Sequence, residues 1–360
     1  MSLPSPVRPL RSRARRLVAA GLAWSSVLVT AAACGSTHAA GTSGSSSQAQ
    51  RLVIYAAEGY DQAMASAFQQ KTGIQVELTD MSTGPLVAKV EAEKAHPLWD
   101  VAWFDGDGTM YTLDQEGLLL RNWQPADVST YTSLGKELQS PDGSYIPTGI
   151  TAAAAFAYNT KLVTAAEAPT TWTALLQPQW KGAVGMNNPA ISGPTFPAVA
   201  GLLHQMGTAA GEKYFAQLKA NGLQVFPTNK PTLAALASGA IKIAFVQDSA
   251  EIQAIAQGAP IHVVYPTDGV TMLPSALGID AHAQDMAAAK AFAAFVLSPD
   301  GQQIMLTQGG GDSNFQPIVQ GEEPNPTRQA TGIDWQIVPV QWQAQHYNAI
   351  QSWFSHSIVG

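Results

Sequence analysis

The chain has 360 residues and carries 19 lysines and arginines against 26 aspartates and glutamates, a net charge of −7 with neutral histidines. Residues 34–360 contain no basic run, and this acidic balance argues against nucleic acid or anionic lipid as a partner, although a few local donors can still hold an anionic ligand. The single cysteine excludes an internal disulfide.

Residues 1–33 have the features of an export signal peptide. Five arginines, without an acidic residue, precede an apolar run from Leu17 to Val29 and the small residues 31–33. The run is interrupted by Gly21 and is too short to cross a bilayer, so export is favoured over the alternative, an N-terminal transmembrane anchor. Removing this segment leaves 14 basic and 26 acidic side chains, a net charge of −12.

Cys34, the only cysteine, follows the signal directly. A lone cysteine at this place predicts lipid attachment, which would anchor the exported protein on the outer face of the cytoplasmic membrane. The segment from Ala31 to Cys34 resembles a bacterial lipoprotein box with Ala31 in place of the usual leucine; the alternative is an ordinary cleavage site beside an incidental cysteine. Residues 34–50, rich in Ser, Gly, Ala, Thr and Gln, are predicted to form a flexible tether.

Strand and helix patterns alternate in the first hundred residues after the tether. Short apolar or alternating runs predict strands, and segments with apolar side chains on one helical face predict the helices between them. This order predicts parallel strands joined by right-handed crossovers. The predicted strands are 52–56, 74–78 and 101–104, and the predicted helices are 60–71 and 83–95.

A second region of the same kind follows. Because 310 residues exceed the usual size of one core, the chain is predicted to form two lobes. Aromatic residues in the tail, which include Trp342 and Tyr347, are interpreted as packing rather than as a binding stripe. The predicted strands here are 183–186, 241–246 and 261–265, and the predicted helices are 197–206, 231–238 and 286–297.

Polar residues follow several of these strands. Open parallel sheets bind ligands beyond the carboxyl ends of their strands, so we expect these loops to face one crevice. A plain turn or helix cap is the alternative for any single loop, but their convergence on one edge favours a binding site. The candidate ligand-binding residues are Glu58, Gly59, Tyr60, Ser82, Thr83, Gly84, Asp105, Asn187, Ser192, Gly193, Thr195 and Asp248, with Tyr158 added from a segment expected to cross between the lobes.

Two of these loops, Ser82–Gly84 and Ser192–Thr195, combine hydroxyl residues with a glycine at a predicted helix start. Unpaired backbone N–H groups and the helix dipole favour an anion at such places. We therefore expect the ligand to carry an anionic group that meets one loop from each lobe.

Enzyme signatures are missing from the sequence. It contains no HExxH, no GxSxG and no GxxxxGK[ST], and its seven histidines lack ligand spacing. A competing hypothesis, an exported hydrolase on a doubly wound sheet, would require His204 or His262 beside a serine or aspartate of the crevice. A purely structural lipoprotein, the third hypothesis, would lack a polar crevice.

Taken together, the segments 52–78, 82–106, NNPAISGPT (187–195), SGAIKIAFVQDSAEI (238–252) and 287–305 resemble extracellular solute-binding proteins of ABC importers. The similarity extends over the whole chain after the tether and favours the branch that binds ferric iron, thiamine, phosphonates and sugar phosphates. It implies an α/β, two-lobed periplasmic-binding-protein-like fold of type II, with mixed sheets flanked by helices and a ligand clamped by hinge closure.

The resemblance also implies the domain boundaries and the partners. Two hinge crossings are expected near residues 149–158 and 273–280. A small-molecule solute and a membrane ABC permease are the expected partners, with no cofactor, no metal and a monomeric state. Lobe 1 would comprise residues 51–150 plus 276–315, and lobe 2 residues 151–275 plus 316–360.

One departure from the family pattern bears on the ligand. Ferric-binding relatives carry adjacent tyrosines after the strand that corresponds to residues 241–246, whereas this sequence has Asp248-Ser249 there. Iron ligation by that pair is therefore not expected. We expect a phosphorylated or zwitterionic small organic solute, with Asp248 available to pair with a ligand cation; a thiamine or metal receptor is the alternative.

Overall fold

The computed structural model describes residues 50–328 and 332–360. The expected signal peptide, Cys34 and all of the tether before Gln50 lie outside the described residues. Within the described part, no helix combines the length and the apolar character that crossing a membrane requires.

The sheet of lobe 1 is built on three parallel strands, β1 (Arg51–Ala56), β2 (Gln75–Asp80) and β3 (Val101–Asp105), in the order β2-β1-β3. The parallel strands predicted from the sequence are therefore confirmed. Helix α1 (Asp61–Thr72) connects β1 to β2 and buries Met64 and Phe68 on one face. It ends at Gly73, which adopts a left-handed φ of 77° that favours glycine.

Two antiparallel strands extend this sheet. Strand β10 (Val270–Ile279) pairs with β3, and β4 (Tyr145–Ala152) pairs with β10, while the short β11 (Trp335–Gln336) pairs with the beginning of β10. Helices α9 (Met286–Leu297) and α10 (Pro299–Gln308) pack beside α1, and the ring of Phe292 on α9 lies edge-on to Phe68. A core of large apolar side chains, which includes Leu52, Ile54 and Trp103 of the strands, thus covers one face of this sheet.

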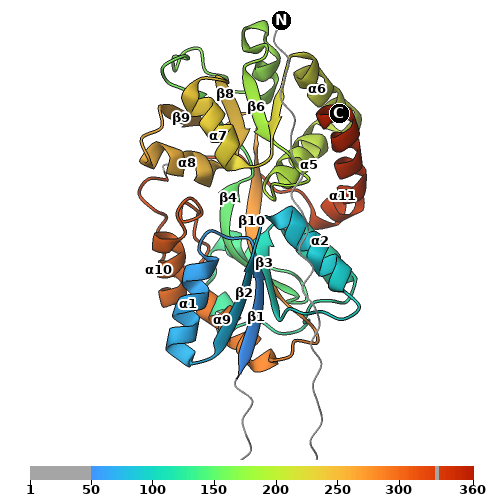
Figure 1. Cartoon of the computed structure of the whole chain (residues 1–360), viewed down its shortest axis with the longest axis vertical. Coiled ribbons are helices and arrows are strands. Elements are labelled where there is room, and N and C mark those ends of the chain that lie inside the picture. The colour runs from blue at the N-terminus through green and yellow to red at the C-terminus, as the bar shows by residue number, and fades with distance from the viewer. Residues whose placement is uncertain (1–49, 329–331) are drawn as a thin grey trace, which may run out of the picture. The chain divides into compact units, whose positions relative to one another are not determined.

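The sheet of lobe 2 has the order β7-β6-β8-β5-β9. Strands β6, β7 and β8 are parallel, and β5 is antiparallel to both β8 and β9. Helices α5 and α6 pack against each other, and α7 and α8 flank the strands, as Figure 1 shows. The bounds are β5 (Ala155–Asn159), β6 (Val184–Asn187), β7 (Gln224–Phe226), β8 (Ile243–Val246), β9 (Ile261–Val264), α5 (Thr195–Met206), α6 (Thr208–Ala220), α7 (Asn229–Ser238) and α8 (Asp248–Ala256).

The chain passes between the lobes along β4–β5 and along β10 (Figure 1). Ala153 and Ala154 join β4 of the first sheet to β5 of the second and already pack in the core of lobe 2. Along β10, Leu273 packs in the core of lobe 2, and Leu277 in the core of lobe 1. A register shift between Ser275 and Ala276 lies just beyond this passage.

The expected end of lobe 1 at Phe315 needs a correction. Ile318 and Val319 are buried in the core of lobe 1, and the amide of Gln320 donates to the carbonyl of Thr130 at 2.8 Å. The chain therefore stays with lobe 1 through Gln320, because these apolar side chains complete that core.

The other elements are α2 (Thr83–Glu93), α3 (Asp107–Gln115), η1 (Ala126–Thr130), α4 (Ser133–Glu137), η2 (Trp172–Leu176), η3 (Pro178–Trp180), α11 (Val340–Phe354) and a last turn (Ser355–Val359). The predicted mixed α/β architecture with two lobes is confirmed.

Candidate ligand-binding site

The two loops predicted to hold an anion meet face to face. Thr83 and Gly84 begin α2 in lobe 1, and the loop from Ala190 to Gly193 follows β6 in lobe 2. A Cβ atom on Gly193 would lie 2.5 Å from Thr83 Cβ, and one on Gly84 would lie 2.5 Å from the Ala190 carbonyl oxygen. These approaches leave no room for a side chain, so the lobes touch here in a closed arrangement.

A cavity of about 290 Å³ lies beside this contact. Both lobes line it, which places it at the crevice expected from the ends of the strands. Its volume is close to the lower end of the usual range for small-molecule sites, about 300 Å³. Its lining residues are Ala57, Ser82, Thr83, Asp105 and Asp312 from lobe 1 and Ser192, Gly193, Pro194, Thr228, Asn229, Lys230 and Gln247 from lobe 2.

The wall contributed by lobe 1 is acidic. Asp105, the last residue of β3, is 7% exposed and accepts a 2.6 Å hydrogen bond at Oδ1 from the Ser275 hydroxyl. Glu58, from the loop after β1, is 4% exposed, and its Oε2 lies 3.4 Å from the same hydroxyl. Asp312 accepts a 2.7 Å hydrogen bond from the amide of Gly59. Asp105 and Asp312 therefore line one end of the cavity, and Glu58 lies behind them, next to the Ser275 hydroxyl that bonds to Asp105.

Burial and mutual repulsion change the acidity of this group. Burial, with the charges of Asp105 and Asp312, raises the pKa of Glu58 well above its usual value. Burial and Asp312 raise the pKa of Asp105 to about 7. Burial also raises the pKa of Asp312 itself, although the Gly59 amide opposes that effect. Each shift has the direction expected for a carboxylate that lacks a nearby cation.

The wall contributed by lobe 2 is polar and partly cationic. Gln247, at the end of β8, donates from Nε2 to Asp105 Oδ2 at 3.2 Å, so it joins the lobes across the cavity. Asn187 is fully buried and braces the loop after β6, because its Nδ2 donates to Ser192 Oγ at 3.2 Å and its Oδ1 accepts from Thr232 at 2.5 Å. Lys230, on the first turn of α7, brings an ammonium group to the same cavity.

Asp248 was expected to pair with a ligand cation, but its carboxylate is paired within the protein. Its carboxylate is fully buried and forms an ion pair with Arg328 at 2.8 Å, and it also accepts hydrogen bonds from the Tyr265 hydroxyl at 2.9 Å and the Ala152 amide at 3.0 Å. Arg328 donates in turn to the carbonyl of Asn314 at 2.6 Å. This carboxylate is therefore occupied by the protein's own donors, which leaves it poorly placed to pair with a ligand cation.

Both candidate tyrosines pack in hydrophobic cores. Tyr158 lies on β5 opposite Ile243 and His262, at the end of the sheet away from the cavity, and belongs to the core of lobe 2. It does not join the candidate site, because β5 begins near the cavity, where Ala155 pairs with Val246, and runs away from it before Tyr158. Tyr60 is 1% exposed and its ring packs on Trp103 at 5.1 Å. Burial and the charges of Glu58, Asp105 and Asp312 raise the pKa of its hydroxyl.

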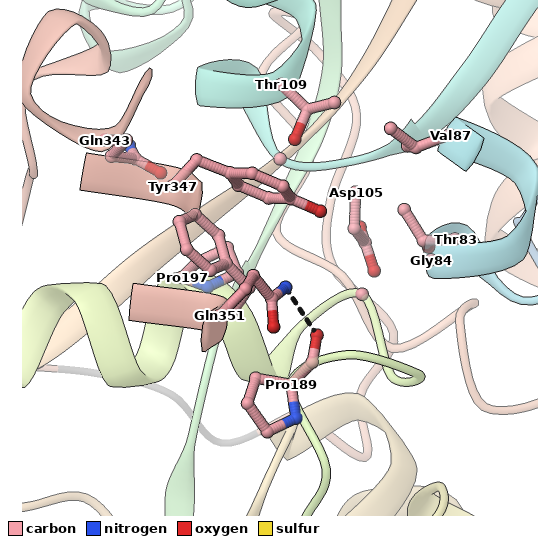
Figure 2. Close-up of a pocket in the computed structure, with 13 residues that line it drawn as sticks. Thr83, Gly84, Val87, Asp105, Thr109, Pro189, Pro197, Gln343, Tyr347 and Gln351 are labelled. Atoms are coloured by element: carbon pink, nitrogen blue, oxygen red, sulfur yellow. Dashed lines mark hydrogen bonds between the residues drawn. The ribbon is translucent and has the colours of Figure 1, made fainter. Parts of the chain in front are cut away.

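The C-terminal helix closes the opposite side of the cleft. Figure 2 shows Tyr347 and Gln351 of α11 around a narrow cavity with Thr83 and Asp105, and Gln351 Nε2 donates to the Pro189 carbonyl at 3.0 Å. The ring of Tyr347 packs on Phe196, 4.6 Å between centroids. The interpretation of the tail aromatics as packing is thus incomplete for Tyr347, which also lines the cleft.

Sequence reasoning missed the site residues that come from distant segments. Asp312, Ser275 and Lys230 do not follow any predicted strand, and only the glycine run 309–311 signalled a tight turn before Asp312. Gln247 lies in a predicted crevice loop directly before Asp248, and no local pattern distinguishes its amide as a contact of Asp105. The candidates that the structure brings to the cleft are Glu58, Gly59, Ser82, Thr83, Gly84, Asp105, Asn187, Ser192 and Gly193, with Thr195 at the start of α5 beside them.

The histidines that the hydrolase hypothesis requires lie away from the cavity. His204 packs on Trp342 and His262 on Tyr158, with ring centroids 5.0 and 5.5 Å apart, and neither lines the cavity. Among the described residues, no group of three His, Cys, Asp or Glu side chains is arranged to hold a metal ion.

Because both lobes line the cavity, the structure is that of a two-lobed ligand-binding protein. Comparisons with known proteins agree with this class. The chain belongs to the family of bacterial extracellular solute-binding proteins, whose model matches residues 63–345. Its role is thus that of an extracellular solute-binding protein. An uncharacterized protein of Haemophilus influenzae is 26% identical over 277 residues, 74% of this chain and 78% of that protein.

Solved structures share the fold. The periplasmic binding protein AfuA from Actinobacillus pleuropneumoniae, with exogenous fructose-6-phosphate bound, superposes with a TM-score of 0.76 at 21% identity, over 86% of this chain and 99% of AfuA. Iron-bound HitA from Pseudomonas aeruginosa gives a TM-score of 0.74 at 22% identity, over 84% of this chain and 98% of HitA. The family resemblance read from the sequence is confirmed, whereas the solute differs among these neighbours.

Proposed function

We propose that this chain is the receptor of an ABC importer that captures one small polar organic solute between its lobes and releases it unchanged to a membrane permease. The observation that supports this most directly is the 290 Å³ cavity, which both lobes line and the Thr83–Gly193 contact closes. A ligand held by both lobes stabilises the closed form, and closure is the signal that such a receptor can present to its permease.

The receptor acts as an exported monomer, anchored through a lipid on Cys34 and extended from the membrane by residues 34–50. It needs no cofactor and catalyses no reaction. The hydrolase hypothesis loses its support because His204 and His262 both lie away from the crevice.

The solute carries an anionic group, phosphate or carboxylate, that meets the start of α2 and the loop after β6. Ser82 occupies the N-cap position of α2 but its side chain makes no capping hydrogen bond, so the first N–H groups of this helix keep their capacity to bind an anion. Lys230 adds a positive charge in the same cavity. AfuA, a structural neighbour, has a sugar phosphate bound, which supports a phosphorylated or zwitterionic solute here.

The test begins with a thermal-shift screen of solute pools that include sugar phosphates, amino acids, thiamine and ferric citrate. A ligand that binds only the folded state raises the melting temperature. Calorimetry with the hit should then show binding weakened about tenfold to a hundredfold by Ser82→Ala, since a charge-assisted hydrogen bond contributes about 1.5–3 kcal/mol. Ser129→Ala, whose hydroxyl bonds only to the Ala126 carbonyl, is the matched control. A screen in which no pool stabilises the protein would contradict the proposed function.

A further inference from the structure

We infer that the C-terminal helix α11 is a latch, docked through Gln343 on Asp107, that favours the closed form of the receptor before any solute binds. The helix is built into lobe 2, yet it also packs on α3 of lobe 1, beside the solute cavity. This inference goes beyond the proposed function, because it concerns the balance between open and closed forms without solute.

The second half of α11 belongs to lobe 2. Ile350 and Phe354 are buried in the core of that lobe. The ring of Tyr347 packs on Phe196 of α5, with 4.6 Å between centroids, and α11 as a whole packs against α5. These contacts tie the helix to lobe 2, so we expect α11 to move with this lobe when the cleft opens or closes.

The first half of α11 reaches across to lobe 1. Helix α3, on which it packs, buries Met110 and Leu113 in a core of lobe 1. Gln343 is 6% exposed, and its Nε2 donates to Asp107 Oδ1, on the first turn of α3, at 3.3 Å. A Cβ on Gly108 would lie 2.8 Å from Gln343 Cβ, so α3 receives the helix closely only because this position has no side chain.

The carboxyl group of Asp107 makes this docking contact specific to the closed form. The residue is buried in lobe 1, yet the only described side chain that donates to it is Gln343, from lobe 2. Burial raises the pKa of Asp107 to about 6, and the bond from Gln343 opposes this shift. When the lobes separate, water can replace the Gln343 amide, whereas the closed form depends on that amide to offset the burial of the carboxylate.

The docked helix also borders the place where the lobes meet. Asp105 lines the solute cavity, and it lies with Tyr347 of α11 around the narrow cavity of Figure 2. Thr83 and Gly193, whose contact joins the lobes, border the same narrow cavity. Docking of α11 on α3 and the contact between the lobes therefore occur at one edge of the cleft, and we expect them to form together.

The experiment measures the distance between two spin labels by double electron–electron resonance, in the full chain and without solute. The labels lie on exposed residues of opposite lobes, introduced as Gln70→Cys on α1 and Ala256→Cys on α8, with Cys34→Ser removing the only natural cysteine. The protein with an unchanged latch should show a closed population. Gln343→Ala should lower the ratio of closed to open molecules about tenfold or more, since the closed form then buries a carboxylate without its donor.

Two further variants test the pair itself. Gln343→Glu places a second carboxyl group opposite Asp107 and should also lower the ratio. Adding Asp107→Asn to it restores a donor and an acceptor with their roles exchanged, and should recover most of the closed population. Gln345→Ala is the matched control, because it makes the same change at an exposed position of α11 and should leave the ratio unchanged.

Three outcomes would overturn the inference: only open molecules when the latch is unchanged, an unchanged ratio in both Gln343→Ala and Gln343→Glu, or an equal loss in Gln345→Ala. Circular dichroism checks that each variant folds. Because no solute enters this measurement, its failure leaves the receptor function standing, and the thermal-shift screen tests that function separately.

Discussion

Gly193 of lobe 2 lies so close to Thr83 of lobe 1 that a Cβ on the glycine would stand 2.5 Å from Thr83 Cβ and nearer still to its hydroxyl oxygen. Real Cβ atoms do not approach so closely. The absence of a side chain at Gly193, as at Gly84, therefore allows the lobes to meet, and the contact closes one side of the solute cavity.

Gly193→Ala and Gly193→Val should weaken solute binding at least tenfold, because the closed form that the solute selects becomes strained. The melting temperature without solute should change little, since the residue lies in a loop at the rim of its lobe. Small-angle scattering should show that solute no longer compacts the variants. Gly311→Ala is the control, because a Cβ there meets its nearest neighbour at an ordinary 3.5 Å. Wild-type affinity in both Gly193 variants would contradict this account of closure.

Asp248→Ala should destabilise the fold rather than remove a ligand contact. Taking one partner from a buried ion pair leaves the other charge without compensation and costs about 3–5 kcal/mol. Arg328 and Asp248 are both fully buried at 2.8 Å, so denaturant unfolding should show a loss of that size, partly restored in the double variant Asp248→Asn with Arg328→Met. Lys71→Met breaks an exposed pair with Asp300 and should cost at most about 1 kcal/mol. Full stability in Asp248→Ala would contradict the structural role.

Asp105→Asn should alter how stability depends on pH. Burial and Asp312 raise the pKa of Asp105 to about 7 in the folded state, against about 4 when unfolded. The folded protein therefore holds more protons across that window, and the contribution of Asp105 to the free energy of unfolding falls as pH rises from about 4 to about 7. The variant should flatten this part of the profile and gain about 1–4 kcal/mol at pH 8 relative to wild type.

Thermal melts from pH 4 to about 8 measure this effect. The groups facing Asp105 are Glu58, Asp312, Ser275 and the Tyr60 hydroxyl on lobe 1, with Gln247 and Lys230 across the cavity. The exposed Glu137→Gln is the control and should keep the wild-type slope. A profile for Asp105→Asn that parallels the wild type would show that Asp105 is ionised in the folded protein at ordinary acidity.

Cys34→Ser should release the protein into the soluble fraction or leave it unprocessed, because the thiol is the proposed point of lipid attachment. Membrane fractionation and gel mobility of the full-length chain measure this. If the variant partitions into membranes and migrates like the wild type, lipidation at Cys34 is wrong.

Ferric citrate added to the purified protein should produce no visible charge-transfer band. The adjacent tyrosines of ferric-binding relatives are replaced by Asp248 and Ser249, and Asp248 is already paired with Arg328. Absorbance titration is the measurement. A saturable visible band would show that this cleft binds iron through other donors.

Local patterns in the sequence determined the elements and the class of fold. The alternation of short apolar runs with helical faces predicted parallel strands, and the structure has β1, β2 and β3 parallel. Turn residues after those strands predicted which loops meet at the crevice, and Thr83 and Gly193 do meet there. Such predictions succeed because periodicity, helix capping and the geometry of parallel sheets depend on residues close in the chain.

Tertiary structure alone decided which charges face the solute. Asp312 reaches the Gly59 amide from 253 residues away, and Arg328 neutralises Asp248 from a segment that no local pattern connected to it. Tyr158, a candidate ligand-binding residue because its segment was expected to cross between the lobes, packs in the core of lobe 2. Burial and ion pairing depend on neighbours that are distant in sequence. The sequence alone therefore could not predict the sign of the charge at each wall of the cleft.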